Sequence, residues 1–224
     1  MRIVFVRHGE PNYEKDCLTP LGHRQAEAAA RRLEEEGIEA IYSSPFGRAL
    51  ETAQAASDHL GVGPVRILDF MHEIYWGSTD GQPVYHGGHP WEIADELARQ
   101  GYDLARTDWP QHPYFRNNQA TLEAERVARE IDAWMATLGY TRTGAYYRCD
   151  RADEAQHTVA LFSHGGSSAA AMARIFNLPF PYMCATMHIP FTGITIARLS
   201  REPGSIALPC LELANDGRHI LGVE

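Results

Sequence analysis

The chain has 224 residues, of which 44% are hydrophobic and 22% are charged, a composition that is ordinary for one folded domain. A chain of this length buries about 70% of its unfolded surface, so it needs no disulfide or metal to hold a core. The formal net charge of -9 disfavours broad binding to a nucleic-acid backbone. A local positive pocket is still compatible with that charge, because arginines in a cleft set the field there. We therefore expect no nucleic-acid partner.

The cysteines and the apolar runs indicate in which cellular compartment the protein resides. No Cys-x-x-Cys pair occurs among the four cysteines, which favours reduced thiols in an intracellular protein. The first six residues are apolar apart from Arg2, but this run is far shorter than a secretory signal, and the charged Arg7 follows it. No run approaches the roughly 20 apolar residues of a membrane span. We expect a cytoplasmic protein with no membrane contact. The cysteines are Cys17, Cys149, Cys184 and Cys210.

The first third of the chain alternates apolar runs with helical patterns. Residues 3–6, 38–42 and 65–68 have the β-branched and apolar character of short buried strands. Thr19-Pro20 is predicted to begin a helix, and Gly37 is predicted to end it. Ser43-Ser44-Pro45 is predicted to cap a second helix that runs to about residue 60. The strand-helix-strand order favours parallel pairing with right-handed crossovers.

The same pattern returns near the end of the chain. Residues 158–162 are predicted to form a strand, and Gly165-Gly166 leads into a helix around residues 168–176. Residues 194–199 and 208–213 are predicted to form further strands. The expected fold is α/β, with a mainly parallel sheet covered by helices on both faces, in a single domain spanning residues 1–224.

The middle of the chain, approximately residues 82–151, shows no clear strand pattern. Residues 91–100 and 120–138 are its two helical candidates, so we expect a mostly helical insertion over the active-site end of the sheet. Such an insertion can carry substrate choice or be a purely structural subdomain, and both alternatives stay open. Its aromatic residues can form a pocket wall or a buried core. They include Trp91, Trp109 and Tyr114.

Four segments place polar residues where predicted strands lead into loops or helices. They are Arg7-His8-Gly9-Glu10, the helix start that carries Arg48, the loop with Glu73, and Ser163-His164-Gly165-Gly166. Each has an ordinary structural explanation when taken alone. Open α/β sheets bind ligands at the carboxyl ends of their strands, so together the four indicate one site. At Gly9 we expect the missing Cβ to let an anion approach the backbone.

The order and spacing of these motifs resemble the histidine phosphatase superfamily, which includes phosphoglycerate mutases and broad-specificity phosphatases. The resemblance covers residues 2–81 and returns from about residue 157, and no motif matches between them. The matching segments are Arg7-His8-Gly9-Glu10, residues 18–26, residues 43–49, Glu73 with Gly77 and Gly81, and Ser163-His164-Gly165-Gly166.

The resemblance implies a site for phosphoryl transfer without a metal or cofactor. His8 is the implied nucleophile, phosphorylated on a ring nitrogen, and a backbone carbonyl that the sequence does not identify is expected to fix its tautomer. Arg7, Arg48 and His164 are expected to surround the phosphoryl oxygens and to keep His8 neutral. Glu73 is expected to protonate the leaving oxygen and later to accept a proton from water.

Asn12 is a further candidate for phosphate contact. Family members often carry an asparagine slightly farther along the chain, so its role is less well supported by the resemblance. His86 and His89 lie in a glycine-rich loop without the ligand spacing of a zinc site, and we expect no bound metal.

The leading hypothesis is a phosphatase acting on a small phosphomonoester. The alternative is a phosphoglycerate mutase, which needs extra cationic groups to hold a bisphosphate, whereas the insertion holds only scattered arginines. A non-catalytic module that binds a phosphorylated ligand is a third alternative, disfavoured because the whole residue set is retained. The oligomeric state is open, with a homodimer as one possibility. The scattered arginines are Arg99, Arg106, Arg116, Arg126 and Arg129.

Overall fold

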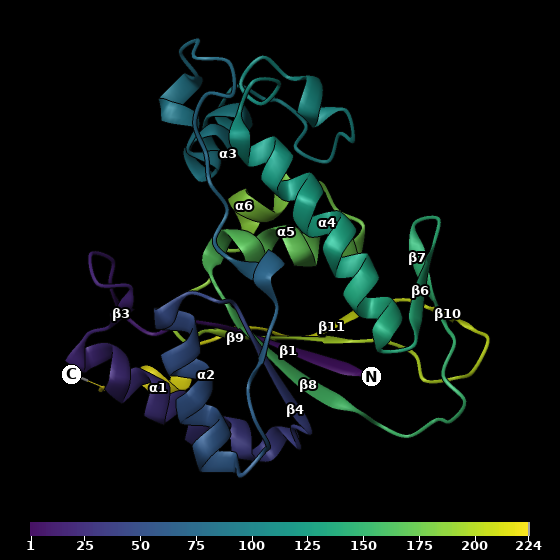
Figure 1. Ribbon diagram of the computed structural model, residues 1–224. Coiled ribbons are helices and arrows are strands. Elements are labelled where there is room, and N and C mark those ends of the chain that lie inside the picture. The colour runs from purple at the N-terminus through teal and green to yellow at the C-terminus, as the bar shows by residue number, and fades with distance from the viewer. Residues whose placement is uncertain (224) are drawn as a thin grey trace.

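A six-stranded sheet forms the centre of the computed structural model, which describes residues 1–223 (Figure 1). Its strands are β1 (Arg2–Arg7), β4 (Ala40–Ser43), β5 (Arg66–Ile67), β8 (Thr158–Ser163), β9 (Ile194–Arg198) and β11 (Cys210–Asp216). They lie in the order β11-β9-β1-β8-β4-β5. The central strands β1, β8, β4 and β5 pair in parallel, and β9 is antiparallel to both of its neighbours. The predicted mainly parallel sheet is confirmed.

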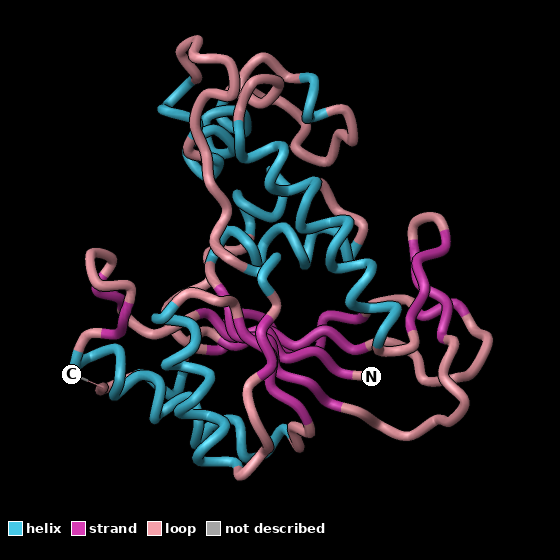
Figure 2. The backbone as a smooth tube through the Cα atoms, in the orientation of Figure 1, coloured by secondary structure: helices cyan, strands magenta, loops and turns pink. Residues whose placement is uncertain are grey.

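Helices cover both faces of this sheet, as the layers in Figure 2 show. One face packs against α1 (Pro20–Arg32) and α2 (Gly47–Leu60), and its buried side chains include Val4 and Val6. The opposite face, with Ile3, joins the core under the other helices. These are α3 (Pro90–Arg99), α4 (Gln119–Thr137), α5 (Gly165–Phe176) and α6 (Phe180–Thr186). Burial on both faces explains why β1 is apolar throughout its middle rather than alternating.

The two N-terminal helices begin in different ways. Thr19 accepts a hydrogen bond from the Gly22 amide, and Pro20 occupies the first turn of α1, as predicted. The chain continues as a 3-10 turn to Gly37, whose φ of 65° ends it. The predicted Ser43-Ser44-Pro45 cap of α2 is wrong, because α2 begins at Gly47 and the Ser44 hydroxyl bonds to a histidine across the sheet.

Residues 82–151 carry α3 and α4 within a residue or two of their predicted positions. The expectation that this segment lacks strands is wrong, because β6 (Tyr140–Thr143) and β7 (Tyr146–Cys149) form a hairpin extended by β10 (Ile206–Ala207). Its strands have only four residues each, and their buried side chains are tyrosine and cysteine rather than an aliphatic run. The hairpin lies beside the C-terminal end of α4, away from α3 (Figure 1).

The remaining regular elements are short. A two-stranded ladder joins β2 and β3 just after β1. None of the helices described within residues 1–223 has the length and apolar character needed to cross a membrane. The short elements are β2 (Pro11–Asn12), β3 (Cys17–Leu18) and 3-10 turns at Leu33–Glu36, Asp69–Met71, Tyr85–Gly88, Trp109–Gln111 and Arg218–Ile220.

Two glycines let the loop after β1 lie directly against α1. A Cβ built on Gly9 would lie 2.6 Å from the Gly22 carbonyl oxygen, and one built on Gly22 would lie 2.1 Å from the Glu10 carbonyl oxygen. The close approach that the structure shows at Gly9 is to the Gly22 backbone, and the approach of an anion there stays a prediction. This contact fixes the chain immediately after His8.

We predict that Gly22→Ala destabilises the fold by about 1–3 kcal/mol, because the new methyl group must displace the Glu10 backbone. Alanine has the better helix propensity, so a purely local effect would have the opposite sign. Gly63→Ala is the matched control, since a Cβ there would meet no atom of the described chain within 4 Å. Denaturant unfolding of both variants measures the difference. Equal stability of the two variants would contradict this account.

Candidate active site

The parallel pairing of β1 with β8 brings the two predicted histidines together. Arg7 is opposite Ser163 in the register, and the His8 amide donates to the Ser163 carbonyl oxygen at 3.0 Å. The rings of His8 and His164 consequently lie with their centroids 5.1 Å apart. Both side chains are buried at the carboxyl ends of their strands, where open α/β sheets bind ligands.

A backbone carbonyl sets the tautomer of His8. Its Nδ1 lies 2.7 Å from the Gly9 carbonyl oxygen, which can only accept, so Nδ1 carries the proton and Nε2 presents a lone pair. Burial is the main reason that the pKa of His8 falls to about 3, and the charges of Arg7 and Arg48 lower it further. The hydrogen bond to Gly9 acts in the opposite direction but is outweighed. His8 is thus a neutral imidazole with Nε2 free for attack.

His164 is also neutral, and its ring is oriented from β4. The Ser44 hydroxyl lies 2.7 Å from Nε2, while Nδ1 is buried without a hydrogen-bond partner within residues 1–223. Burial lowers the pKa of His164 well below its usual value, and the neighbouring His8 and Arg48 act in the same direction. If Ser44 donates to Nε2, the proton of the neutral ring resides on Nδ1, which then faces the site as a donor.

Arg7 is held by the segment before β9. Its Nη1 donates to the Ile189 carbonyl oxygen at 2.6 Å, and the guanidinium carbon lies 4.4 Å from the centre of the Phe191 ring. The Nε–H is buried and has no acceptor in the described part of the chain. Burial lowers the pKa of Arg7, but arginine retains its charge at neutral pH.

Arg48 lies in the first turn of α2 and pairs with Asp16. The carboxylate of Asp16 accepts from Nη1 of Arg48 and, at 2.8 Å, from the Gly47 amide. The guanidinium also lies over the rings of Phe46 and Tyr13. As at Arg7, the buried Nε–H is unpartnered among residues 1–223. Three buried polar atoms near His8, the Nε–H groups of Arg7 and Arg48 and Nδ1 of His164, thus have no hydrogen-bond partner within residues 1–223.

Glu73 binds the first turn of α5. Its Oε1 accepts from the Ile74 and Ser167 amides at 2.9 and 3.0 Å, and its Oε2 accepts from the Gly166 amide at 3.3 Å. Burial raises the pKa of this carboxyl group even though these amides and Arg7 favour its ionised form. A Cβ on Gly166 would lie 2.7 Å from Oε1, so glycine is required there. A raised pKa suits a group that must donate a proton near neutral pH.

The structure places Asn12 differently from the other predicted residues. It lies in β2, and its side-chain oxygen accepts from the Lys15 amide at 3.1 Å, which holds the turn towards β3. Contact between Asn12 and a phosphate stays a prediction. Sequence reasoning missed Asp16 and Ser44, which orient Arg48 and His164, because each pair is separated by at least 32 residues and meets only in the fold.

A cleft of about 540 Å³ opens beside these groups. Arg7, Glu73 and Gly165 form its floor, and the insertion contributes Trp91 to its wall, so part of the insertion lines the site. Trp109, in contrast, is buried in the core. The other lining residues are Tyr13, Trp76, His89, Met187, His188, Ile189 and Pro190.

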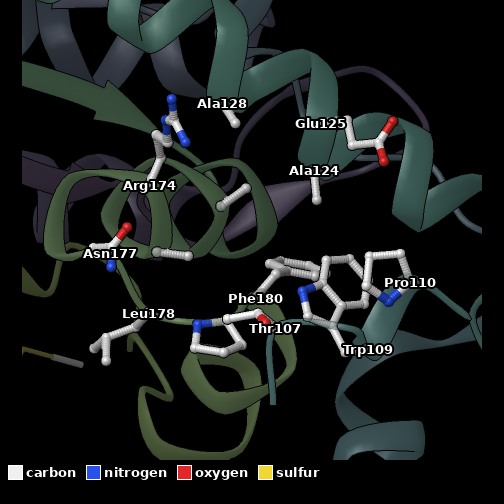
Figure 3. A pocket seen from close by; sticks show the side chains of 13 residues that line it. Thr107, Trp109, Pro110, Ala124, Glu125, Ala128, Arg174, Asn177, Leu178 and Phe180 are labelled. Carbon is white, nitrogen blue, oxygen red and sulfur yellow. The ribbon is translucent and has the colours of Figure 1, made fainter. Parts of the chain in front are cut away.

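Figure 3 shows a second pocket, of about 280 Å³, between α4 and the C-terminal end of α5. Its labelled side chains include Trp109, Phe180 and Arg174, and it shares no residue with the cleft described above. Among residues 1–223, no group of three His, Cys, Asp or Glu side chains is arranged to hold a metal ion.

Comparison with known proteins agrees with this geometry. Residues 3–210 match the model of the histidine phosphatase superfamily (branch 1). The chain belongs to this superfamily. The predicted family is confirmed, and so is the enzyme class, a phosphoric monoester hydrolase of the histidine phosphatase type, to which the named phosphatase relatives correspond.

Three relatives indicate how similar the chain is to members of this superfamily. A putative phosphoserine phosphatase 2 of Hydrogenobacter thermophilus is 33% identical over an alignment that covers 92% of this chain and 93% of that relative's length. A glucosyl-3-phosphoglycerate phosphatase of Mycolicibacterium vanbaalenii is 28% identical over 80% of this chain and 75% of its own. The native structure of a mycobacterial glucosyl-3-phosphoglycerate phosphatase superposes with a TM-score of 0.65 at 25% identity, over 96% of this chain and 98% of that one.

We predict that the His8 ring stays neutral from about pH 8 to about pH 5 in the folded protein, because its pKa is about 3. The unfolded chain titrates near 6.5, so it binds more protons below that pH, and the stability due to neutral His8 is lost as the pH falls. NMR of protein labelled in its histidine rings measures this titration, with the denatured chain as control. A folded-state midpoint near 6.5 would contradict the prediction.

Proposed function

We propose that this protein hydrolyses a small phosphomonoester through a phosphohistidine intermediate on His8, without a metal. The observation that carries the proposal is a set of buried polar atoms without partners among residues 1–223, namely Nε of Arg7 and Arg48 and Nδ1 of His164, near a neutral imidazole. Buried donors are normally hydrogen-bonded, and leaving one unsatisfied costs about 1–3 kcal/mol. A phosphoryl group, with three oxygens that spread its charge, offers acceptors for all of them.

In the first half-reaction, Nε2 of His8 attacks phosphorus. The new bond joins Nε2 to phosphorus, and the bond from phosphorus to the ester oxygen breaks. Arg7, Arg48 and His164 stabilise the equatorial oxygens as charge develops there. Glu73 gives its proton to the departing oxygen, so the leaving group is released as an alcohol and the carboxylate remains.

In the second half-reaction, a water molecule takes the place of the leaving group. Glu73, now ionised, accepts a proton from the water as its oxygen attacks phosphorus, and the bond from Nε2 to phosphorus breaks. Inorganic phosphate is released, and neutral His8 and protonated Glu73 are regenerated. The amides of Ile74, Gly166 and Ser167 stabilise the carboxylate between the two steps.

The charges in the cleft favour a phosphatase over a mutase. Of its lining residues in the described chain, only Arg7 is an arginine or lysine, whereas a mutase must hold a second phosphate. The arginines of the insertion pair with neighbours, as Arg106 does with Asp108 and Arg126 with Glu123. These pairs leave the leaving-group side without a second phosphate-binding cluster, which supports hydrolysis of a small phosphorylated substrate.

We predict that His8→Ala lowers phosphate release from 4-nitrophenyl phosphate by at least about 10³-fold, because the attacking nitrogen is lost. His59→Ala is the control, since this partly exposed histidine on α2 pairs with Glu34. The measurement is release of inorganic phosphate, with thermal unfolding to verify the fold. Absence of release by the wild type from a broad panel of phosphoesters would support a binding module, and transfer within a phosphoglycerate without net release would support a mutase.

We predict that Glu73→Ala separates the two half-reactions. The 4-nitrophenolate group departs without protonation, so His8 still becomes phosphorylated, but the attacking water lacks its base. Stopped-flow absorbance should show a rapid burst of about one equivalent of nitrophenolate, followed by turnover at least about 10²-fold slower than in the wild type. Unchanged steady-state turnover would remove Glu73 from the mechanism.

A further inference from the structure

Three aromatic side chains form one wall of the cleft. Trp76, His89 and Trp91, here called the aromatic wall, all line it. The rings of Trp76 and His89 lie 5.1 Å apart, those of His89 and Trp91 lie 5.4 Å apart, and those of Trp76 and Trp91 meet edge to face at 6.3 Å. The three rings therefore support one another as a single packed surface.

The aromatic wall stands beside the atoms that act on the leaving group. Trp76 follows Glu73 by three residues, and both line the same cleft as Arg7. The indole of Trp91 reaches the start of α5, where its Cζ2 lies 3.7 Å from the position of a Cβ built on Gly165. A group leaving from phosphorus at His8 is thus released into the space that these rings bound.

The Trp76 side chain is partly exposed to solvent in the cleft. Its side chain is 41% exposed, although tryptophan is among the largest apolar side chains and is usually covered. Its neighbour Trp91, in the first turn of α3, is partly buried. An exposed indole beside a catalytic cleft provides a surface for a flat partner, since offset and edge-to-face contacts between rings stabilise binding.

The charges of the cleft disfavour an anionic leaving group. Arg7 is the only arginine or lysine among the lining residues described, and it is already placed at the phosphoryl group. Next to the cleft-lining His89, the Glu92 carboxylate lies 3.8 Å from Nδ1 of His89 and 3.2 Å from Nδ1 of His86. A carboxylate on the leaving group would be desolvated there beside an existing carboxylate, without a guanidinium or ammonium group to pair with.

Resting on the function proposed above, we propose that the aromatic wall binds the leaving group and selects phosphomonoesters that carry an uncharged aromatic or heteroaromatic ring. The ring stacks against Trp76, while Glu73 protonates the ester oxygen. Trp76 is therefore the residue that determines specificity beyond the phosphate.

The test compares three esters that release alcohols: benzyl phosphate, 4-carboxybenzyl phosphate and ethyl phosphate. The two benzyl esters differ only in the carboxylate, and the ethyl group is too small to cover the aromatic wall. In the wild type, we expect kcat/KM for benzyl phosphate to exceed that for each of the others by about tenfold or more. Equal values for benzyl and 4-carboxybenzyl phosphate would overturn the charge selection.

The variants Trp76→Ala and Trp76→Phe test the stacking. We expect Trp76→Ala to lower kcat/KM for benzyl phosphate by about tenfold more than kcat/KM for ethyl phosphate, whereas Trp76→Phe retains most of the preference. Tyr146→Ala is the matched control, because this exposed aromatic residue lies on β7, outside the cleft. Its kinetics should match the wild type.

The outcomes distinguish a failure of the aromatic-wall proposal from a failure of the proposed phosphatase function. If the wild type hydrolyses none of the three esters, the proposed function fails. If it hydrolyses them and Trp76→Ala lowers benzyl and ethyl phosphate equally, the side chain serves the fold and the inference alone is overturned. The variant His89→Ala checks this conclusion at a second ring, with the same selective loss expected for benzyl phosphate.

Discussion

The parallel pairing of β1 with β8 is the constraint on which the site depends. It places Arg7 opposite Ser163 and so brings His8 and His164 to adjacent strand ends. Because both strands are central and covered on both faces, the two rings are buried. Burial keeps them neutral, and neutrality leaves a lone pair on Nε2 of His8. The chemical state of the proposed nucleophile therefore follows from the depth of the strands in the sheet as much as from the identity of the residue.

Around this pair, the protein leaves polar groups incompletely satisfied. Arg7, Arg48 and His164 are each held on one side by Ile189, Asp16 and Ser44, respectively. The other side of each keeps a buried nitrogen with no hydrogen-bond partner in the described chain. The anchored side fixes the geometry, and the open side favours binding of a phosphoryl group, whose oxygens accept these donors as charge develops. Glu73 is the opposite case, because its carboxylate accepts hydrogen bonds from three amides. Burial nevertheless raises its pKa, which suits the proton exchange that we propose for both half-reactions.

Local patterns in the sequence predict the order of the central elements and the positions of His8, Arg48, Glu73 and His164 near strand ends, because apolar runs and helix stops are short-range signals. They do not predict Ser44 opposite His164, Asp16 opposite Arg48 or Trp76 beside Trp91, since these contacts depend on how distant segments meet. Asp16 has a φ of 49°, a conformation that aspartate tolerates, but sequence alone does not reveal it. The sequence does not indicate the hairpin of β6 and β7, because its strands lack an aliphatic run. Ser43-Ser44-Pro45 resembles a helix cap, because the sequence does not show the distant histidine that Ser44 contacts.

The most direct test of the account is to identify the phosphorylated atom during turnover. Glu73→Ala protein is mixed with 4-nitrophenyl phosphate, quenched in alkali, which preserves phosphohistidine, and analysed by peptide mass spectrometry and phosphorus-31 NMR. The account predicts about one phosphoryl group per chain, on Nε2 of His8, as expected for a covalent intermediate. Phosphate release by the wild type would contradict the account if no phosphoryl group is found on His8, or if the phosphoryl group is found on His164.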